Sequence, residues 1–224
     1  MKTNKIQIKL ATTAAFTALG VGLLINAATL TGAQAPPPVD PAIIGTSAPI
    51  AGSWSVDPAH TNVTFAIKHM GISLVRGRFD DIAGTIVADP DHLDKSSVQF
   101  TIQSTSIDTN VKMRDDDLRS ATYFDVAKYP TITFQSTKIE KKKRDYVAYG
   151  NLTIHGVTKP IALPFTVSGP IHDPFGGVRF GILTNIHLSR LDYGVGAADK
   201  FSTGILAIGD DVDVAISVEG VPTK

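Results

Sequence analysis

The side chains that could carry out chemistry are few in this chain and stand far apart. The histidines are His60, His69, His92, His155, His172 and His187. None of them forms a His-x-His or His-x-x-x-His pair, so their spacing predicts no metal site. Because the chain has no cysteine, a thiolate zinc site, a catalytic thiol and a disulfide framework are excluded. No carboxylate pair and no Ser-His-Asp order stands out, so we predict no catalytic residue, no cofactor and no enzyme.

Three polar residues are candidates for contacting the polar end of a ligand. His60 and His69 could meet across a strand or near the mouth of a barrel, and a structural histidine is the alternative that we favour for each. Arg190 could bind a phosphate or pair with a carboxylate, and a structural ion pair is the alternative that we favour. These three residues would also be the first suspects if the protein were an enzyme.

One short basic run, KKKR at residues 141–144, lies between two predicted strands. Such a run attracts anionic lipid headgroups with about 1 kcal/mol per residue. A solvated hairpin tip is the simpler interpretation, and we favour it. The chain as a whole carries 21 basic and 21 acidic residues, so it has no basic surplus that would predict a nucleic-acid partner.

These candidates belong to a chain that alternates apolar and polar residues almost throughout from residue 53 onward. The clearest alternating stretches are residues 63–67, 98–102, 132–134, 161–167, 182–188 and 212–218. In a strand such residues all point to one side, so each strand has one apolar and one polar face, as in antiparallel sheets. About eight such strands can form a sandwich or a barrel, and a barrel leaves no free edge. An eight-stranded barrel is either filled by side chains or holds one slender ligand.

Two places depart from this alternation. Val111, Arg114 and Leu118 stand at helical spacing, which predicts one short helix over residues 110–120 with an asparagine as its N-cap. We expect this helix to close one end of the sheet. Pro164 stands inside an apolar run, where it predicts a strand end, a bulge or an edge position.

The first 35 residues are predicted to be a secretory signal peptide. Three lysines precede an apolar stretch over residues 10–30, and cleavage is expected near Ala33 or Ala35. An uncleaved anchor is the alternative, because the apolar stretch is close to the roughly 20 residues that span a bilayer. Residues 36–52 then form a proline-rich linker, and residues 53–224 form the folded domain. The signal predicts a periplasmic or secreted protein.

Short motifs run through the domain in a fixed order. They occupy residues 54–65, 69–71, 75–79, 106–109, 114–120, 124–134, 150–160, 190–194 and 209–212. The most recognisable is GNLTIHGVTKP at residues 150–160. With these motifs the domain resembles the YceI-like family over nearly its whole length. The resemblance implies a lipocalin-like barrel that holds a long polyisoprenoid or similar amphiphile, a periplasmic location in Gram-negative bacteria, and a homodimer in some members.

Alternation and resemblance together predict an all-β fold, an extended eight-stranded antiparallel lipocalin-like barrel with one short helix. We predict an exported protein that holds a long apolar isoprenoid or related amphiphile in its lumen, such as a polyprenyl phosphate, a quinone or a fatty-acid-like molecule. The predicted ligand-binding residues are Phe65, Ile67, Phe79, Phe100, Ile102, Phe134, Leu152, His60, His69 and Arg190. For each phenylalanine taken singly, a packed core is the alternative that we favour, whereas for the set we expect some contacts with the ligand if the barrel is hollow. For the whole protein, the alternatives are an enzyme acting on a lipid-like substrate in the same barrel and an exported stress protein with a solid core.

Overall fold

The computed structural model describes residues 51–223. The predicted signal peptide (1–35) and nearly all of the predicted linker (36–52) lie outside the described residues, so both stay predictions. None of the helices between residues 51 and 223 is long and apolar enough to cross a bilayer.

The described part of the chain forms a sheet of eleven strands with one α-helix. The strands are β1 (Gly52–Val56), β2 (Asn62–His69), β3 (Ser73–Phe79), β4 (Ile82–Ala88), β5 (Ser97–Gln103), β6 (Ile107–Asp108), β7 (Thr131–Lys142), β8 (Asp145–Ile154), β9 (Val157–His172), β10 (Val178–Ser189) and β11 (Ile208–Pro222). The helices are α1 (Lys112–Arg119) and the short 3-10 turns η1 (Leu93–Lys95), η2 (Ser104–Ser106) and η3 (Leu191–Tyr193).

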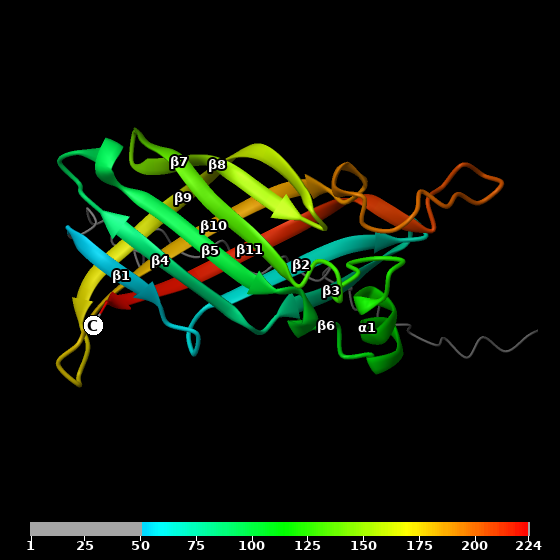
Figure 1. The fold of residues 1–224 in the computed structure, drawn as a ribbon, viewed down its shortest axis with the longest axis horizontal. Coiled ribbons are helices and arrows are strands. Elements are labelled where there is room, and N and C mark those ends of the chain that lie inside the picture. The colour runs from blue at the N-terminus through cyan, green and yellow to red at the C-terminus, as the bar shows by residue number, and fades with distance from the viewer. Residues whose placement is uncertain (1–50, 224) are drawn as a thin grey trace, which may run out of the picture. The chain divides into compact units, whose positions relative to one another are not determined.

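The eleven strands occupy eight positions around a closed barrel. β1 and β2 both pair with β11. On their other side, β1 pairs with β4 and β2 pairs with β3. In the next position, β4 pairs with β5 and β3 pairs with β6. These six strands are therefore three interrupted ones, and β7 to β11 complete the ring. The ring closes where β1 pairs with β11 (Figure 1). Trp54 lies opposite Pro222 in this pairing. The predicted eight-stranded antiparallel barrel is confirmed.

The period-two alternation decides which side chains face inward. On β10 the apolar residues from Phe180 to Leu188 face the interior, while Asn185 and His187 between them are exposed. On β11 the set from Val212 to Val218 faces the same interior. Because neighbouring strands in the barrel contribute their apolar faces in the same way, the interior is lined by one continuous apolar surface.

One end of the barrel, which we call the closed end, is packed solid. Its buried side chains are Trp54, Val56, Ile86, Ala88, Val98, Ile139, Tyr146, Ala148, Val167 and Phe180. The Trp54 and Phe180 rings meet edge to face with centroids 4.8 Å apart, and the Tyr146 ring stacks on another ring, Phe165, at 5.4 Å. Gly220 leaves room for this packing, because a Cβ there would lie 2.5 Å from the Phe180 ring.

The helix α1 and the loop over residues 195–207 lie at the other end of the barrel (Figure 1). The predicted helix is confirmed, but the prediction of Asn110 as its N-cap is wrong. Asn110 adopts a left-handed backbone conformation with φ 60°, and the helix starts after Val111, which makes no capping side-chain bond. The buried Asp115 instead accepts a 2.9 Å hydrogen bond from the Thr109 backbone N–H, which ties the helix to the strand before it.

The wall of the barrel is split between β9 and β10. The two strands pair from His172 opposite Val178 only as far as Thr166 opposite Leu183. Residues 157–165 of β9 pair with β8 alone. Pro164 lies in this unpaired edge, as predicted, because a proline has no N–H to donate to a second neighbour. Side chains rather than backbone hydrogen bonds must therefore complete the wall along this stretch.

Candidate functional site

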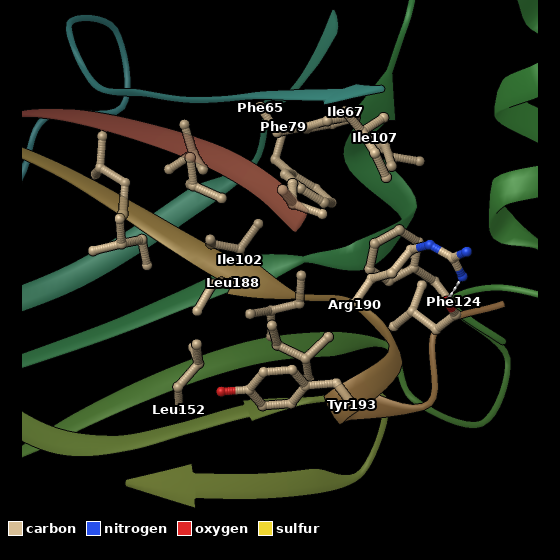
Figure 2. Close-up of a pocket in the computed structure, with 18 of the residues that line it drawn as sticks. Phe65, Ile67, Phe79, Ile102, Ile107, Phe124, Leu152, Leu188, Arg190 and Tyr193 are labelled. Carbon is tan, nitrogen blue, oxygen red and sulfur yellow. Dashed lines mark hydrogen bonds between the residues drawn. The ribbon is translucent and has the colours of Figure 1, made fainter. Parts of the chain in front are cut away.

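A cavity of about 760 Å³ occupies the half of the barrel away from the closed end, which we call the hollow half. Its walls are mainly the inward apolar faces of the strands (Figure 2). Met113 and Leu118 of α1 and Phe124 of the segment after it also line the cavity. Met113 lines the cavity and is also exposed to solvent, so the cavity reaches the surface beside α1. This volume falls in the range of about 300–1,000 Å³ that is usual for small-molecule sites.

Nine of the ten residues predicted to bind ligand line this cavity. They are Phe65, Ile67, Phe79, Phe100, Ile102, Phe134, Leu152, His69 and Arg190. Whether any of them contacts a ligand stays a prediction. The tenth, His60, does not line the cavity, and the idea that it meets His69 is wrong, since the two histidines flank opposite ends of β2.

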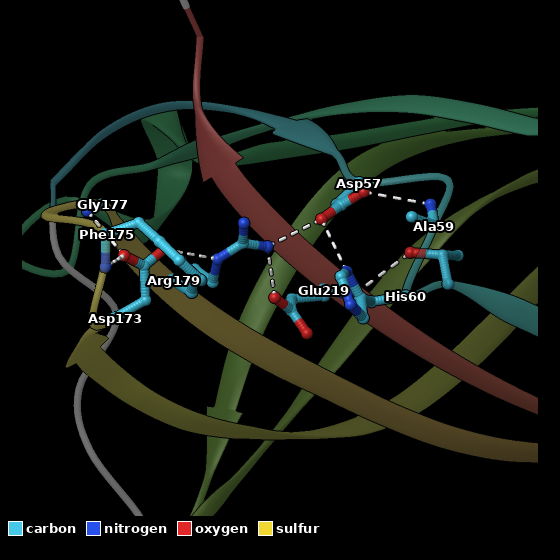
Figure 3. A network of polar contacts seen from close by, with 9 residues as sticks. Asp57, Ala59, His60, Asp173, Phe175, Gly177, Arg179 and Glu219 are labelled. Atoms are coloured by element: carbon cyan, nitrogen blue, oxygen red, sulfur yellow. Dashed lines mark hydrogen bonds and ion pairs between the residues drawn. The ribbon is translucent and has the colours of Figure 1, made fainter.

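His60 belongs to a polar cluster near the closed end (Figure 3). Its Nδ1 lies 2.8 Å from Asp57 Oδ2, and Arg179 Nη1 donates to the same carboxylate at 2.7 Å and to Glu219. The hydrogen bonds from His60 and Arg179 lower the pKa of Asp57 to about 2. The cluster thus joins the loop after β1 to β10 and β11, and His60 has a structural role in it.

Three ligand atoms of this polar cluster are close enough for one cation. Asp57, His60 and Glu219 place theirs within 4.8 Å of one another. The Arg179 guanidinium already lies against both carboxylates and supplies positive charge there. A metal ion at this position would have to displace it, so the cluster is better explained as an ion-pair network.

Arg190 is 7% exposed, and its guanidinium is engaged by the backbone. It donates to the carbonyls of Val195 at 2.7 Å, Gly209 at 2.8 Å, Ala197 at 2.9 Å and Ile208 at 3.0 Å. The expected structural ion pair of Arg190 is therefore wrong, because no carboxylate within residues 51–223 pairs with it. The expected structural role is correct, because backbone carbonyls hold the guanidinium instead. A guanidinium has five N–H groups, so one N–H is left on Nη1. The side chain anchors the loop over residues 195–207 to the start of β11.

Ionisable side chains line the cavity where β2 ends and where α1 lies. Lys68 and His69 come from the end of β2, and Arg114 and Asp117 come from α1. Arg114 is held in place by a 2.7 Å bond from its Nε to Thr109 Oγ1 and a 2.8 Å bond from Nη2 to the carbonyl of the same residue. The cavity therefore has an apolar interior and a polar mouth, which is the arrangement of an amphiphile site.

Two hydroxyl groups interrupt the apolar lining, and sequence reasoning missed both. Tyr193 is 3% exposed, and its Oη points into the cavity (Figure 2). It has no hydrogen-bond partner within residues 51–223. Burial, followed by the nearby charge of Asp192, raises the pKa of Tyr193. Thr184 Oγ1 is buried without a partner in the same part of the chain.

The sequence contains a signal for one of these two residues and none for the other. Thr184 could have been found, because it is the one polar member of the inward set on β10. Tyr193 lies in η3, beyond the end of the strand, and no periodicity covers that turn. The Tyr193 ring is held near the split in the wall by Lys159 of β9, whose Nζ lies 5.8 Å from the ring centroid and 2.8 Å from Asp192 Oδ2.

Comparison with known proteins agrees with this architecture. The family model described as YceI-like domain matches residues 54–220. A UPF0312 protein of Yersinia pestis is 34% identical over 177 residues, covering 78% of this chain and 89% of the relative. The crystal structure of Burkholderia cenocepacia BcnA superposes with a TM-score of 0.65 at 25% identity, over 73% of this chain and 98% of that one.

A third similar protein is a domain from Saccharophagus degradans that is described as polyisoprenoid-binding and implicated in plant cell wall breakdown. It superposes with a TM-score of 0.58 at 18% identity, over 76% of this chain and 98% of that one. At this level of identity the likeness concerns the fold alone.

Proposed function

Because this chain belongs to the YceI-like family, we propose that its barrel binds a long apolar molecule, a polyisoprenoid or a related amphiphile, without catalysing a reaction. The observation that carries the proposal is the hollow half of the barrel, a cavity of about 760 Å³ with apolar walls and a polar mouth. A chain buried in such a space gains roughly 0.8 kcal/mol per methylene before the costs of ordering it. Tight binding therefore needs few polar contacts.

The ligand class is further supported by the Saccharophagus degradans domain, which has the same fold and is described as polyisoprenoid-binding. The alternative of a stress protein with a solid core is less consistent with the cavity, since only the closed end is filled. The catalytic alternative needs acid and base groups that converge on the cavity. Of its three suspects, His60 lies outside the cavity and Arg190 is engaged by carbonyls, so binding is favoured.

Native mass spectrometry of protein extracted gently from its own host tests the proposal. We expect a co-purified molecule of lipid mass that is released when the protein unfolds. A matched pair of variants on β10 locates it: Ile186→Trp fills the cavity, whereas Asn185→Trp places the same ring on the outer face. The inward variant should lose the bound molecule and the outward one should keep it. A ligand-free wild-type spectrum, or equal loss in both variants, would sink the proposal.

We also propose that the protein is exported, on the ground of its N-terminal signal sequence. Fractionation of host cells should find it outside the cytoplasm, and the intact mass should correspond to a chain starting at Gln34 or Pro36. A mass that includes Met1 in a membrane fraction would support the uncleaved anchor instead. The same native spectrum reports whether the protein is a homodimer.

A further inference from the structure

Two hydroxyl groups that line the hollow half, those of Thr184 and Tyr193, have no hydrogen-bond partner within residues 51–223, and the one on Tyr193 extends furthest from the wall. Tyr193 is 3% exposed, and its hydroxyl lies among aliphatic side chains such as Leu152 (Figure 2). No atom within residues 51–223 accepts a hydrogen bond from it. The hydroxyl borders the cavity, so a hydrogen-bond partner for it can come only from water or from a bound molecule. The position therefore calls for a partner that is not part of the chain.

The Tyr193 ring itself is well fixed. It follows the end of β10, at the split where residues 157–165 of β9 pair with β8 alone. Lys159 of β9 lies over its face at 5.8 Å from the centroid and is held there by its ion pair with Asp192. The ring thus forms part of the wall, and only its hydroxyl group extends toward the space inside.

The surroundings decide which acceptor suits this hydroxyl. Burial raises the pKa of Tyr193, so the phenol stays protonated at neutral pH and acts as a donor. An anionic acceptor would need a cation beside it. Lys159 lies over the face of the ring, and its charge is already paired with Asp192. The Arg190 guanidinium is held by the carbonyls of Val195 and Ile208 and points away from the Tyr193 hydroxyl (Figure 2). The other cationic side chains that line the cavity, Lys68, His69 and Arg114, come from β2 and α1.

We propose that Tyr193 Oη donates a hydrogen bond to a neutral acceptor oxygen of the ligand, the carbonyl of a quinone, amide or ester, inside the barrel. This inference rests on the proposed function and narrows it. The ligand is not a plain hydrocarbon, and at least one of its polar atoms lies within the cavity rather than at the mouth. The acceptor is uncharged, so a phosphate or carboxylate is not what Tyr193 binds.

The substitution Tyr193→Phe tests this directly, because it removes the hydroxyl and keeps the ring in the wall. Two probes are titrated into delipidated protein: a prenylated benzoquinone and squalene, an isoprenoid hydrocarbon without oxygen. We expect the variant to bind the quinone about 3- to 10-fold more weakly, the range of one neutral hydrogen bond, and to bind squalene as the wild type does. In infrared spectra, the quinone carbonyl stretch should shift to lower wavenumber in the wild type and not in the variant.

Tyr146→Phe is the matched control, since Tyr146 is a buried tyrosine of the closed end that does not line the cavity. It should leave both affinities unchanged. The inference is overturned if Tyr193→Phe leaves quinone binding unchanged, or if it weakens squalene equally, because the ring alone would then explain the effect. Wild-type protein that binds neither probe would count against the proposed function itself, and a wild type that binds squalene but not the quinone would count against this inference alone.

Discussion

The closed end and the hollow half of this barrel are built by the same strands, yet one is solid and the other is empty. β10 contributes Phe180 to the closed end and Ile186 to the cavity, at positions of the same inward face. The difference lies in what joins the strands around them. At the closed end, β1 pairs with both β4 and β11, and aromatic rings meet across the interior. In the hollow half, β9 and β10 separate and α1 follows β6 instead of another strand.

This comparison indicates that the closed end contributes mainly to stability and the hollow half mainly to ligand binding. The closed end should contribute most of the free energy of unfolding, because its side chains make van der Waals contacts on all sides. The hollow half should tolerate loss of volume, because its side chains already face empty space. Substitutions in the two regions can therefore separate stability from binding.

The largest expected effect is at the closed end. Phe180→Ala should lower the free energy of unfolding by about 3–5 kcal/mol, because it leaves a cavity under the Trp54 ring. Two valines make the comparison at constant chemistry: Val167→Ala at the closed end should cost more than Val214→Ala in the hollow half. Urea unfolding measures both. Equal losses for the two valines would contradict this difference between the two regions.

The next effect concerns the mouth of the hollow half, where polar contacts replace packing. Arg190→Met should cost about 3 kcal/mol, because four carbonyls lose a charged donor in a buried position. Hydrogen exchange in the loop over residues 195–207 should become faster. Lys200→Met, in the same loop but exposed, is the control and should change neither quantity. Unchanged hydrogen exchange in the Arg190 variant would show that the order of this loop does not depend on the hydrogen bonds from Arg190.

A smaller effect links the closed end to pH. The folded-state pKa of Asp57 is about 2, below its ordinary value of 3.8, so its contribution to stability is present above about pH 4 and is lost as the pH falls toward 2. Because the side chain is partly solvated, we expect a contribution of about 1 kcal/mol. Urea midpoints between pH 2 and pH 6 should fall more steeply for the wild type than for Asp57→Asn. Parallel curves would show that Asp57 does not contribute to the pH dependence of stability.

The smallest expected effect is a gain. Thr184→Val replaces a buried hydroxyl that has no partner within residues 51–223 by a methyl group of similar size. Since the hydroxyl pays desolvation without a hydrogen bond in return, the variant should be more stable by up to about 1 kcal/mol in thermal melts. Destabilisation would mean that the hydroxyl has a partner, such as an ordered water molecule in the cavity.

Much of the barrel wall could be predicted from local pattern alone. Phe65, Ile102 and Phe134 were placed on an inward face because alternation has a period of two, whatever the rest of the chain does. Pro164 was placed at an edge for an equally local reason, since proline lacks an N–H. Such predictions need only the residue and its immediate neighbours in the chain.

The sequence by itself thus determined the strands, their inward faces and the family, because these follow from short-range periodicity and short motifs. Only the tertiary structure decided that half of the lumen is empty, since that volume depends on where β9 leaves β10 and how β1 closes on β11. It also decided the roles of His60, Arg190 and Tyr193, each set by partners or space contributed by segments distant in the chain or beyond a strand end. Contacts of that kind arise from packing in three dimensions, which no local pattern encodes.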